Sequence, residues 1–422
     1  MARLTPRALP GALGALMLAA LIAVAMALPD ASVGQGRDAT TTLFSRTPDG
    51  NTPNGPSTNP HISADLRYSQ IVAYESEASD LVARDTNGLK DVFAVRRAGS
   101  FGDTGSAWTP GKTQLVSRSA TGKPANGPSF DATTDGSAKD RARCVAFLSD
   151  ASNLVSGDTN GQTDAFLAKA PKFVPTRVSL PKNKQSSSDT THVAVSGDCS
   201  KVAFVSGGGL YVRSGKSTKR IDVKGAEADP SYDTGDTTGL VFGASGGVYL
   251  LAEGASKPTL VAKGGRNPGF IQRRRQGKVL RTVIYETDRG GFSQIGLRSI
   301  GGGERIVSSW DGDVGNGDSR EPSIFNAGFN AAFVSDASNL PIKSSGALGD
   351  RNGLRDAYFW SGSPNVPQPV TILESVDSGN DPLSSGAEHV STSYYRNYVV
   401  FDSAANRTGA EPQIWMRYLG GI

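Results

Sequence analysis

Cysteine is nearly absent from this chain: its 422 residues hold only Cys144 and Cys199. Lipoprotein anchoring needs a cysteine just after an export signal, so it is excluded. Long runs of one charge are also lacking. Lysine and arginine are scattered and the formal net charge is +4, which gives no reason to expect nucleic acid as a partner. The one basic cluster, residues 273–278, is expected to be a solvated hairpin, with a polyanion contact as the alternative.

Helical periodicity is lacking as well. Outside the N-terminus no stretch shows a sustained helical period, and 51 glycines, 23 prolines and only four methionines are typical of a turn-rich chain of strands. Hydrolase signatures are missing: the sequence has no hydrolase domain beside the repeats and no series of Asp-boxes. The pattern G-x-S-x-G occurs once, at residues 243–247, but it lies between two short apolar runs of strand character and not at a strand-to-helix turn. Glu75, Glu286 and Glu374 stand in isolation, and we expect them to face solvent.

The N-terminus holds the one long apolar run. A basic start precedes an uninterrupted apolar stretch over residues 11–28 that ends in small residues, as signal peptidases require. Residues 1–27 are therefore predicted to be a signal peptide, or an uncleaved anchor, since the run is about long enough to span a bilayer. Residues 28–40 would be a linker and residues 41–422 the folded domain. Either alternative predicts export to the periplasm, the cell envelope or the extracellular space.

A repeat recurs at three distant places. Residues 71–93 read IVAYESEASDLVARDTNGLKDVF and residues 144–166 read CVAFLSDASNLVSGDTNGQTDAF, with 13 of these 23 positions identical. A third copy begins at Ala332 as AFVSDASNL, carries a six-residue insertion, and ends from Asp350 as DRNGLRDAYF. Self-similarity at such intervals predicts supersecondary units that are stacked or arranged radially.

Each copy has the pattern of two short strands around a turn-rich gap, with one further segment upstream and one downstream. Four short strands per unit are typical of a β-propeller blade. Weaker copies follow at residues 201–213, 240–251, 279–298 and 398–418, which gives seven units of roughly 50 residues. The predicted fold is all-β, a seven-bladed β-propeller of four-stranded blades.

The last unit lacks a fourth strand. Residues 41–46 match the fourth-strand segments of other units, so we expect this N-terminal strand to complete the C-terminal blade. Closure of this kind would remove two exposed sheet edges, whereas an independent edge strand is the alternative.

The succession P-x-I-S-x-D, x-V-A-F-x-S and D-x-F/Y resembles the TolB-type (WD40-like, PD40) propeller repeat and covers nearly all of residues 41–422. The loop A-S-N-L-V-x-G-D-T-N-G resembles a subgroup common in secreted bacterial proteins. The Asp-Gly turn typical of the family is eroded, for example at Asp65-Leu66-Arg67 and Asp198-Cys199-Ser200. The resemblance therefore implies the fold and no particular member of the family.

The D-T-N-G-x-x-D loops place three oxygen-bearing side chains on a tight turn, as a hard cation such as Ca²⁺ prefers. The candidate calcium ligands are Asp85, Asn87 and Asp91; Asp158, Asn160 and Asp164; and Asp350, Asn352 and Asp356. Their spacing resembles the end of the D-x-D-x-D-G-x-x-D calcium loop of some propellers, but Ala83, Ser156 or Leu348 replaces the first carboxylate. Turn chemistry, with carboxylates that accept backbone amides, is the alternative.

The three histidines fall at or near predicted innermost strands, which line the channel of a propeller. His192 and His389 occupy equivalent positions and His61 lies two residues beyond that position. These imidazoles form an alternative candidate metal site, since oligogalacturonate lyases resemble TolB-type propellers and hold a metal with channel histidines. The other reading is that they are satisfied polar residues of a channel wall.

Cys144 and Cys199 lie near the second strands of neighbouring blades, so in an oxidising compartment they could form a disulfide or stay apart.

The leading functional hypothesis is an exported, non-enzymatic scaffold that binds a protein or a glycan, with Ca²⁺ as the only cofactor considered for it. The alternative is a metal-dependent polysaccharide lyase or hydrolase that uses the channel histidines. We expect a monomer, with no membrane contact beyond an N-terminal anchor. The binding surface is predicted to centre on residues 85–90, 158–163 and 350–355, because long loops over a rigid scaffold carry recognition residues.

Overall fold

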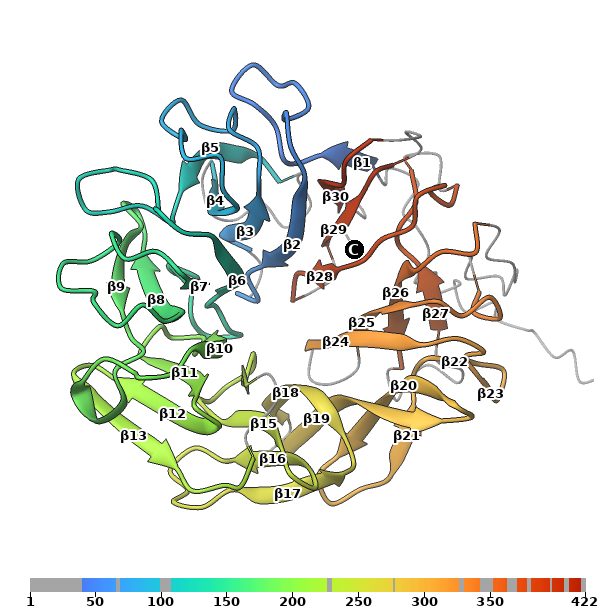
Figure 1. Cartoon of the computed structure of the whole chain (residues 1–422). Helices are drawn as coiled ribbons and strands as arrows, with labels where there is room; N and C mark the ends of the chain where they lie inside the picture. Colours follow the sequence, from blue (N-terminus) through green and yellow to red (C-terminus); the bar gives the residue numbers. More distant parts are fainter. Residues whose placement is uncertain are drawn as a thin grey trace, which may run out of the picture. The chain divides into compact units, whose positions relative to one another are not determined.

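The computed structural model describes residues 40–65, 69–98, 108–225, 230–275, 278–325, 330–341, 352–362, 370–377, 381–394, 397–405 and 410–418. All of them belong to one compact unit, Val33–Ile422. Their strands form seven four-stranded antiparallel sheets and one two-stranded ribbon. The sheets radiate from a common centre and follow one another around it in sequence order (Figure 1). The predicted seven-bladed propeller is confirmed.

The blades are built as follows, from the innermost strand outward. Blade 1 has β2 (Ser57–Ile62), β3 (Ile71–Ser76), β4 (Asp91–Arg97) and β5 (Pro110–Leu115), and blade 2 has β6 (Ser129–Thr134), β7 (Cys144–Ser149), β8 (Asp164–Lys169) and β9 (Val174–Arg177). Blade 3 has β10 (Thr190–Val195), β11 (Lys201–Ser206), β12 (Gly209–Ser214) and β13 (Ser217–Ile221), and blade 4 has β14 (Ser231–Tyr232), β15 (Leu240–Ala244), β16 (Gly247–Leu251) and β17 (Thr259–Lys263).

The remaining blades follow the same plan. Blade 5 has β18 (Arg266–Arg275), β19 (Lys278–Arg289), β20 (Phe292–Ser299) and β21 (Glu304–Ile306), and blade 6 has β24 (Ser319–Phe325), β25 (Asn330–Ser335), β26 (Asp356–Ser361) and β27 (Val370–Leu373). Blade 7 has β28 (Val390–Thr392), β29 (Tyr398–Ser403), β30 (Gln413–Tyr418) and β1 (Thr40–Leu43). The ribbon is β22 (Ser309–Trp310) with β23 (Asp313–Val314), and η1 (Pro181–Asn183) is a single 3-10 turn. In the part of the chain that the structure describes, no helix has the length and apolar character needed to cross a membrane.

The N-terminal strand closes the ring, as the sequence predicts. β1 pairs with β30 in antiparallel register, Thr40 opposite Tyr418 and Leu43 opposite Trp415. The Thr41 hydroxyl donates a hydrogen bond to the carbonyl of Val376 at 2.8 Å, which ties the closing strand to the connection that leaves blade 6.

The core consists of seven apolar clusters, one between each pair of neighbouring blades. Between blades 1 and 2, for example, the cluster contains Ala73 together with the stacked rings of Phe147 and Phe166, whose centroids lie 5.6 Å apart. A propeller strand is buried on both faces, and this explains why V-A-F reads as a continuous apolar run. Because small and large side chains alternate along it, adjacent sheets can interdigitate.

The serine that ends each V-A-F-x-S run has a structural role. Ser76 Oγ lies 3.0 Å from Ser57 Oγ and accepts the amide of Ala78 at 3.1 Å. Ser149 repeats both contacts, with Ser129 at 2.9 Å and the amide of Ala151 at 3.1 Å. This pairing joins the innermost strand to the second strand where the long loop begins.

Candidate functional site

The long loops between the second and third strands end against the neighbouring blade. In each case the carbonyl oxygen of the residue just before the third strand accepts a hydrogen bond from a backbone amide of the next blade. That amide belongs to the innermost strand of the next blade or to the segment that leads to it. The pairs are Ser129 N to Lys90 O at 2.8 Å, Thr190 N to Thr163 O at 2.8 Å and Ala387 N to Arg355 O at 2.7 Å. The loops of blades 1, 2 and 6 therefore lie on the face where the innermost strands begin.

In the loop of blade 1 the candidate ligands make turn contacts. Asp91 is fully buried, its Oδ1 accepts the Ser117 hydroxyl at 2.5 Å and its Oδ2 accepts Asn87 Nδ2 at 2.6 Å. Asn87 Oδ1 accepts the amide of Leu89 at 3.1 Å, and Gly88 adopts φ +65°, a conformation that glycine reaches without strain. Burial, strengthened by the nearby charge of Asp85, raises the pKa of Asp91 to about 7.

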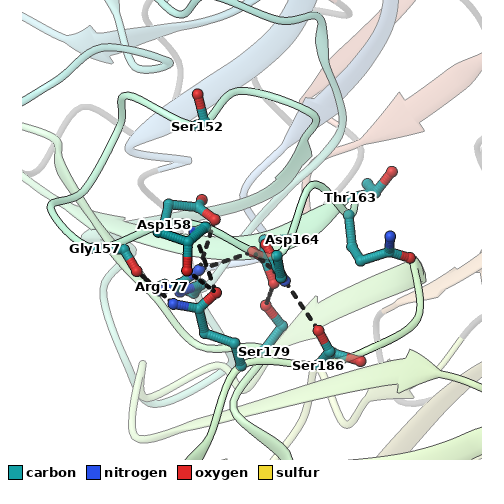
Figure 2. Close-up of polar contacts among 12 residues, drawn as sticks. Ser152, Gly157, Asp158, Thr163, Asp164, Arg177, Ser179 and Ser186 are labelled. Carbon is teal, nitrogen blue, oxygen red and sulfur yellow. Dashed lines mark hydrogen bonds and ion pairs between the residues drawn. The ribbon is translucent and has the colours of Figure 1, made fainter.

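The loop of blade 2 repeats this arrangement with one addition (Figure 2). Asp164 accepts the Ser179 hydroxyl at 2.5 Å and Asn160 Nδ2 at 3.1 Å. Arg177 of β9 also enters the loop, and its Nη1 lies 2.9 Å from Asp158 Oδ1 and 3.0 Å from Asp164 Oδ2. The two carboxylates of this loop thus share an internal guanidinium.

In the loop of blade 6, Asp356 Oδ1 accepts the Ser375 hydroxyl at 2.7 Å and Asn352 Nδ2 donates to the carbonyl of Leu383 at 2.8 Å. The remaining predicted ligand, Asp350, lies outside the described residues. All three loops show the contacts expected of turn chemistry, and calcium binding stays a prediction.

A polar residue stands at the start of most innermost strands, at the mouth of the central channel. Four of these residues adopt left-handed backbone conformations at a β-bulge: Asn59, Asp131, Asn267 and Glu321, with φ of 50°, 53°, 45° and 54°. Asparagine and aspartate tolerate this region, whereas for a glutamate it costs about 1–2 kcal/mol. Such strain is frequent at functional sites, so the channel mouth is a candidate site together with the loops.

The three histidines do not come together as metal ligands. His61 Nδ1 lies 2.9 Å from Thr134 Oγ1 inside a channel cavity of about 370 Å³, and burial lowers its pKa to about 4. His192 lies on β10 of blade 3. Over the described ranges, the one group of three histidine, cysteine or acidic side chains with ligand atoms within 4.8 Å of one another is Asp135, Cys144 and Cys199.

His389 instead lies between two carboxylates at the channel mouth. Its Nδ1 is 2.5 Å from Asp402 Oδ2 and its Nε2 is 3.7 Å from Glu321 Oε1. Burial disfavours the imidazolium, but the hydrogen bond and charge of Asp402, with the charges of Glu321 and Glu75, outweigh burial and raise the pKa of His389 to about 9. Burial, with the charges of Asp402 and Glu286, raises the pKa of Glu321 to about 7, although His389 opposes this rise.

The expectation that Glu75, Glu286 and Glu374 face solvent is wrong. Their exposed fractions are 5%, 7% and 0%. Glu374 pairs with the buried Arg417, whose Nε lies 3.4 Å from its Oε2. A carboxylate can be buried in this way only when partners satisfy it, and these partners come from other strands, which the local sequence does not reveal.

Two of these glutamates and Asp402 join neighbouring blades at the channel mouth. Each occupies the same position of a second strand and accepts a hydrogen bond from its own blade and one from the next blade. Glu75 accepts Asn59 Nδ2 at 2.7 Å and Asp131 N at 2.8 Å; Glu286 accepts Asn267 Nδ2 at 2.9 Å and Glu321 N at 3.0 Å; Asp402 accepts Asn59 N at 3.1 Å besides His389. The sequence does carry a signal for these residues: in three units an acidic residue directly follows the aromatic residue of the second strand.

The channel mouth is continuous with the loop of blade 1. A cavity of about 680 Å³ is lined by Asn59, Glu75, Glu77, Gly88, Leu89, Lys90, Pro128, Phe130 and Asp131. Lys90 spans the two parts, since its Nζ lies 3.6 Å from Glu75 Oε2. Loop residues and channel residues therefore form one surface.

Cys144 and Cys199 form a disulfide that joins blades 2 and 3, with their Cα atoms 6.2 Å apart. Cys199 belongs to the turn before β11 and adopts φ +56°. Asp135 Oδ1 accepts the amides of Arg143 and Cys144, each at 2.7 Å, and so positions the other end of the bond.

No family model and no curated protein matches the chain. Among solved structures it is similar to a TolB protein from Agrobacterium tumefaciens, with 17% identity over 53% of this chain and 72% of the other and a TM-score of 0.36. A Trypanosoma rangeli sialidase in complex with the inhibitor DANA gives 10% identity and a TM-score of 0.37, over 92% of this chain and 58% of the other. An ancestral GH74 enzyme gives 12% identity and a TM-score of 0.46, over 91% and 51%.

The chain thus spans a little over half the length of the two enzymes. The ring of seven blades agrees with the TolB-type repeat identified in the sequence.

Proposed function

We propose that the protein is an exported, non-enzymatic binding module that holds a protein segment or a glycan on the face of the long loops. The cavity that joins the loop of blade 1 to the channel mouth supports this proposal. It combines apolar surface from Leu89 and Phe130 with the charged groups of Lys90, Glu77 and Asp131. Apolar contact with a few placed polar groups is the usual composition of a recognition site.

The rigidity of the cavity also supports recognition. Its floor is built from strands, and Glu75 fixes the bulge of blade 1 and the bulge of blade 2 through the two hydrogen bonds described above. A preorganised surface loses little conformational entropy when a ligand binds. The loop above it, residues 77–90, can differ between blades without disturbing this floor.

Export is part of the proposal. The predicted signal peptide and the disulfide between Cys144 and Cys199 both favour an oxidising compartment, because disulfides are rare in the cytosol.

An enzyme that uses the channel histidines is less well supported. His61 hydrogen-bonds Thr134, whereas His389 is held between Asp402 and Glu321, so the two imidazoles serve different local networks. An imidazole whose pKa is raised to about 9 is a poor general base near neutral pH.

A pair of matched charge reversals tests the proposal. Lys90→Glu changes the loop face, whereas Lys216→Glu makes the same change in the turn between β12 and β13. That turn joins third and fourth strands and therefore lies on the opposite face. The wild-type chain and both variants would be immobilised and probed with a glycan array and with cell-envelope extract of the source organism. We expect a ligand retained by wild type and by Lys216→Glu, and reduced at least tenfold with Lys90→Glu.

Equal capture by all three proteins would place the binding surface elsewhere. Equal unfolding temperatures of the two variants would show that any difference in capture does not come from misfolding.

A further inference from the structure

The long loop of blade 2 contains its own cation. Arg177 places Nη1 within 3.0 Å of one oxygen of Asp158 and one of Asp164, and its Nη2 donates to the carbonyl of Gly157 at 3.3 Å (Figure 2). The side chains of all three charged residues are at most 9% exposed. The guanidinium therefore marks a position where one positive charge meets three oxygen atoms.

Blade 1 has oxygen atoms at the three equivalent positions. In the aligned repeat Asp85 corresponds to the first carboxylate and Asp91 to the second, while the carbonyl of Arg84 corresponds to that of Gly157. The supporting contacts also recur, because Asp91 accepts the Ser117 hydroxyl as Asp164 accepts Ser179.

Blade 1 lacks the guanidinium. Arg177 of β9 lies opposite Phe166 in the sheet, and the residue of β5 opposite the equivalent Phe93 is Leu115. Leu115 is buried in the apolar cluster between blades 7 and 1. The loop of blade 1 thus has the two carboxylates of blade 2 with an uncharged side chain where blade 2 has its arginine.

The absence of this arginine from blade 1 affects the carboxylate of Asp85. It is only 6% exposed, and among the described residues its Oδ1 has no hydrogen-bond partner. A buried carboxylate oxygen without a partner carries a desolvation cost that a bound cation would remove.

We propose that the loop of blade 1 binds one Ca²⁺ ion at the position that the guanidinium occupies in blade 2. The protein ligands are Asp85 Oδ1, Asp91 Oδ2 and the carbonyl oxygen of Arg84. Ca²⁺ accepts six to eight oxygen ligands in flexible geometry, so water completes the shell on the side where Thr86 and Gly88 are exposed. Mg²⁺ demands stricter octahedral geometry and fits this set less well.

The amide of the loop asparagine is compatible with this ion. In blade 2 Asp164 Oδ2 accepts Asn160 Nδ2 at 3.1 Å and contacts Arg177 at 3.0 Å at the same time. Asp91 Oδ2 can accept the hydrogen bond from Asn87 and bind a cation in the same way. With few protein ligands the affinity is expected in the range of extracellular calcium modules, with a Kd of about 0.1–1 mM.

Reciprocal substitutions test the proposal by calcium stoichiometry, measured by equilibrium dialysis and titration calorimetry. Leu115→Arg places an arginine in blade 1 and should remove one Ca²⁺ per chain. Arg177→Leu removes the resident cation from blade 2 and should add one. Asp85→Asn should also remove one site, and it preserves the volume of the side chain if Leu115→Arg does not fold. The thermal midpoint of the wild type should rise by about 2 °C in 10 mM Ca²⁺, and less in 10 mM Mg²⁺.

Several results would overturn it. One is a wild-type chain that takes up no Ca²⁺ at 10 mM. Another is an unchanged stoichiometry in Asp85→Asn, and a third is a folded Arg177→Leu variant that gains no site. Leu115→Met is the matched control, since it alters the same apolar position without adding charge and should bind like wild type.

Discussion

The disulfide between blades 2 and 3 allows a quantitative prediction. Replacing Cys144 and Cys199 with alanine opens a loop whose ends are 55 residues apart in sequence. In the chain-entropy account a cross-link of this length stabilises the folded state by about 4 kcal/mol, because it restricts the unfolded chain. The native geometry should survive, since Asp135 holds the start of β7 through hydrogen bonds to the amides of Arg143 and Cys144.

For a domain of roughly 380 residues this free energy corresponds to a decrease of about 5 °C in the thermal unfolding midpoint. Differential scanning calorimetry of the oxidised wild type and the double variant measures it directly. Urea titration gives a second readout, because the denaturant dependence of the unfolding free energy should be steeper when the unfolded chain is no longer cross-linked.

Reduction provides the internal control. Wild type with its disulfide reduced should unfold like the double variant, and the same reductant should leave the variant unchanged. Midpoints of oxidised wild type and variant that agree within about 1 °C would refute the reasoning that this cross-link constrains the unfolded chain.

Two further predictions concern closure and pH. Deleting residues 40–47 removes the buried Phe44 and uncovers the edge of β30. The unfolding free energy should therefore fall by more than the roughly 3–5 kcal/mol that the loss of a single buried phenylalanine side chain costs. An unchanged melting temperature would show that β1 does not hold the ring together. Because the pKa of His389 is raised to about 9 in the folded state, its stabilising effect is complete below about pH 6.5 and is lost as the pH rises through 9. His389→Gln should therefore flatten the stability profile between these values, and parallel profiles would mean that His389 is not charged in the folded protein.

The repeat predicted the fold because its signal is local. The V-A-F run, the serine that follows it and the turn before the third strand each lie within one unit, and their recurrence gives the blade count directly. The pairing of β1 with β30 was also accessible, since residues 41–46 carry the pattern of a fourth strand that the last unit lacks.

The polar networks were not predictable because they depend on contacts between strands, within one blade or between two. Nothing near Glu75 shows that Asn59 and the amide of Asp131 will satisfy its carboxylate. Likewise Arg177 lies 13 residues beyond Asp164, and only the register of β8 and β9 brings the two together. A one-residue shift of that register would turn Arg177 to the other side of the sheet.

The closing strand has a consequence for the order of events in folding. Thr40 and Tyr418 pair across almost the entire domain, so blade 7 cannot form until the last strand has been synthesised and has emerged. Until then six blades can assemble only as an open arc, whose end blades expose the apolar faces that pack against blade 7 in the closed ring. Contacts of such long range form slowly, because a very long loop must close first. If the proposed export proceeds through an unfolded chain, this delay is an advantage, because the ring is completed only after both ends have reached the same compartment.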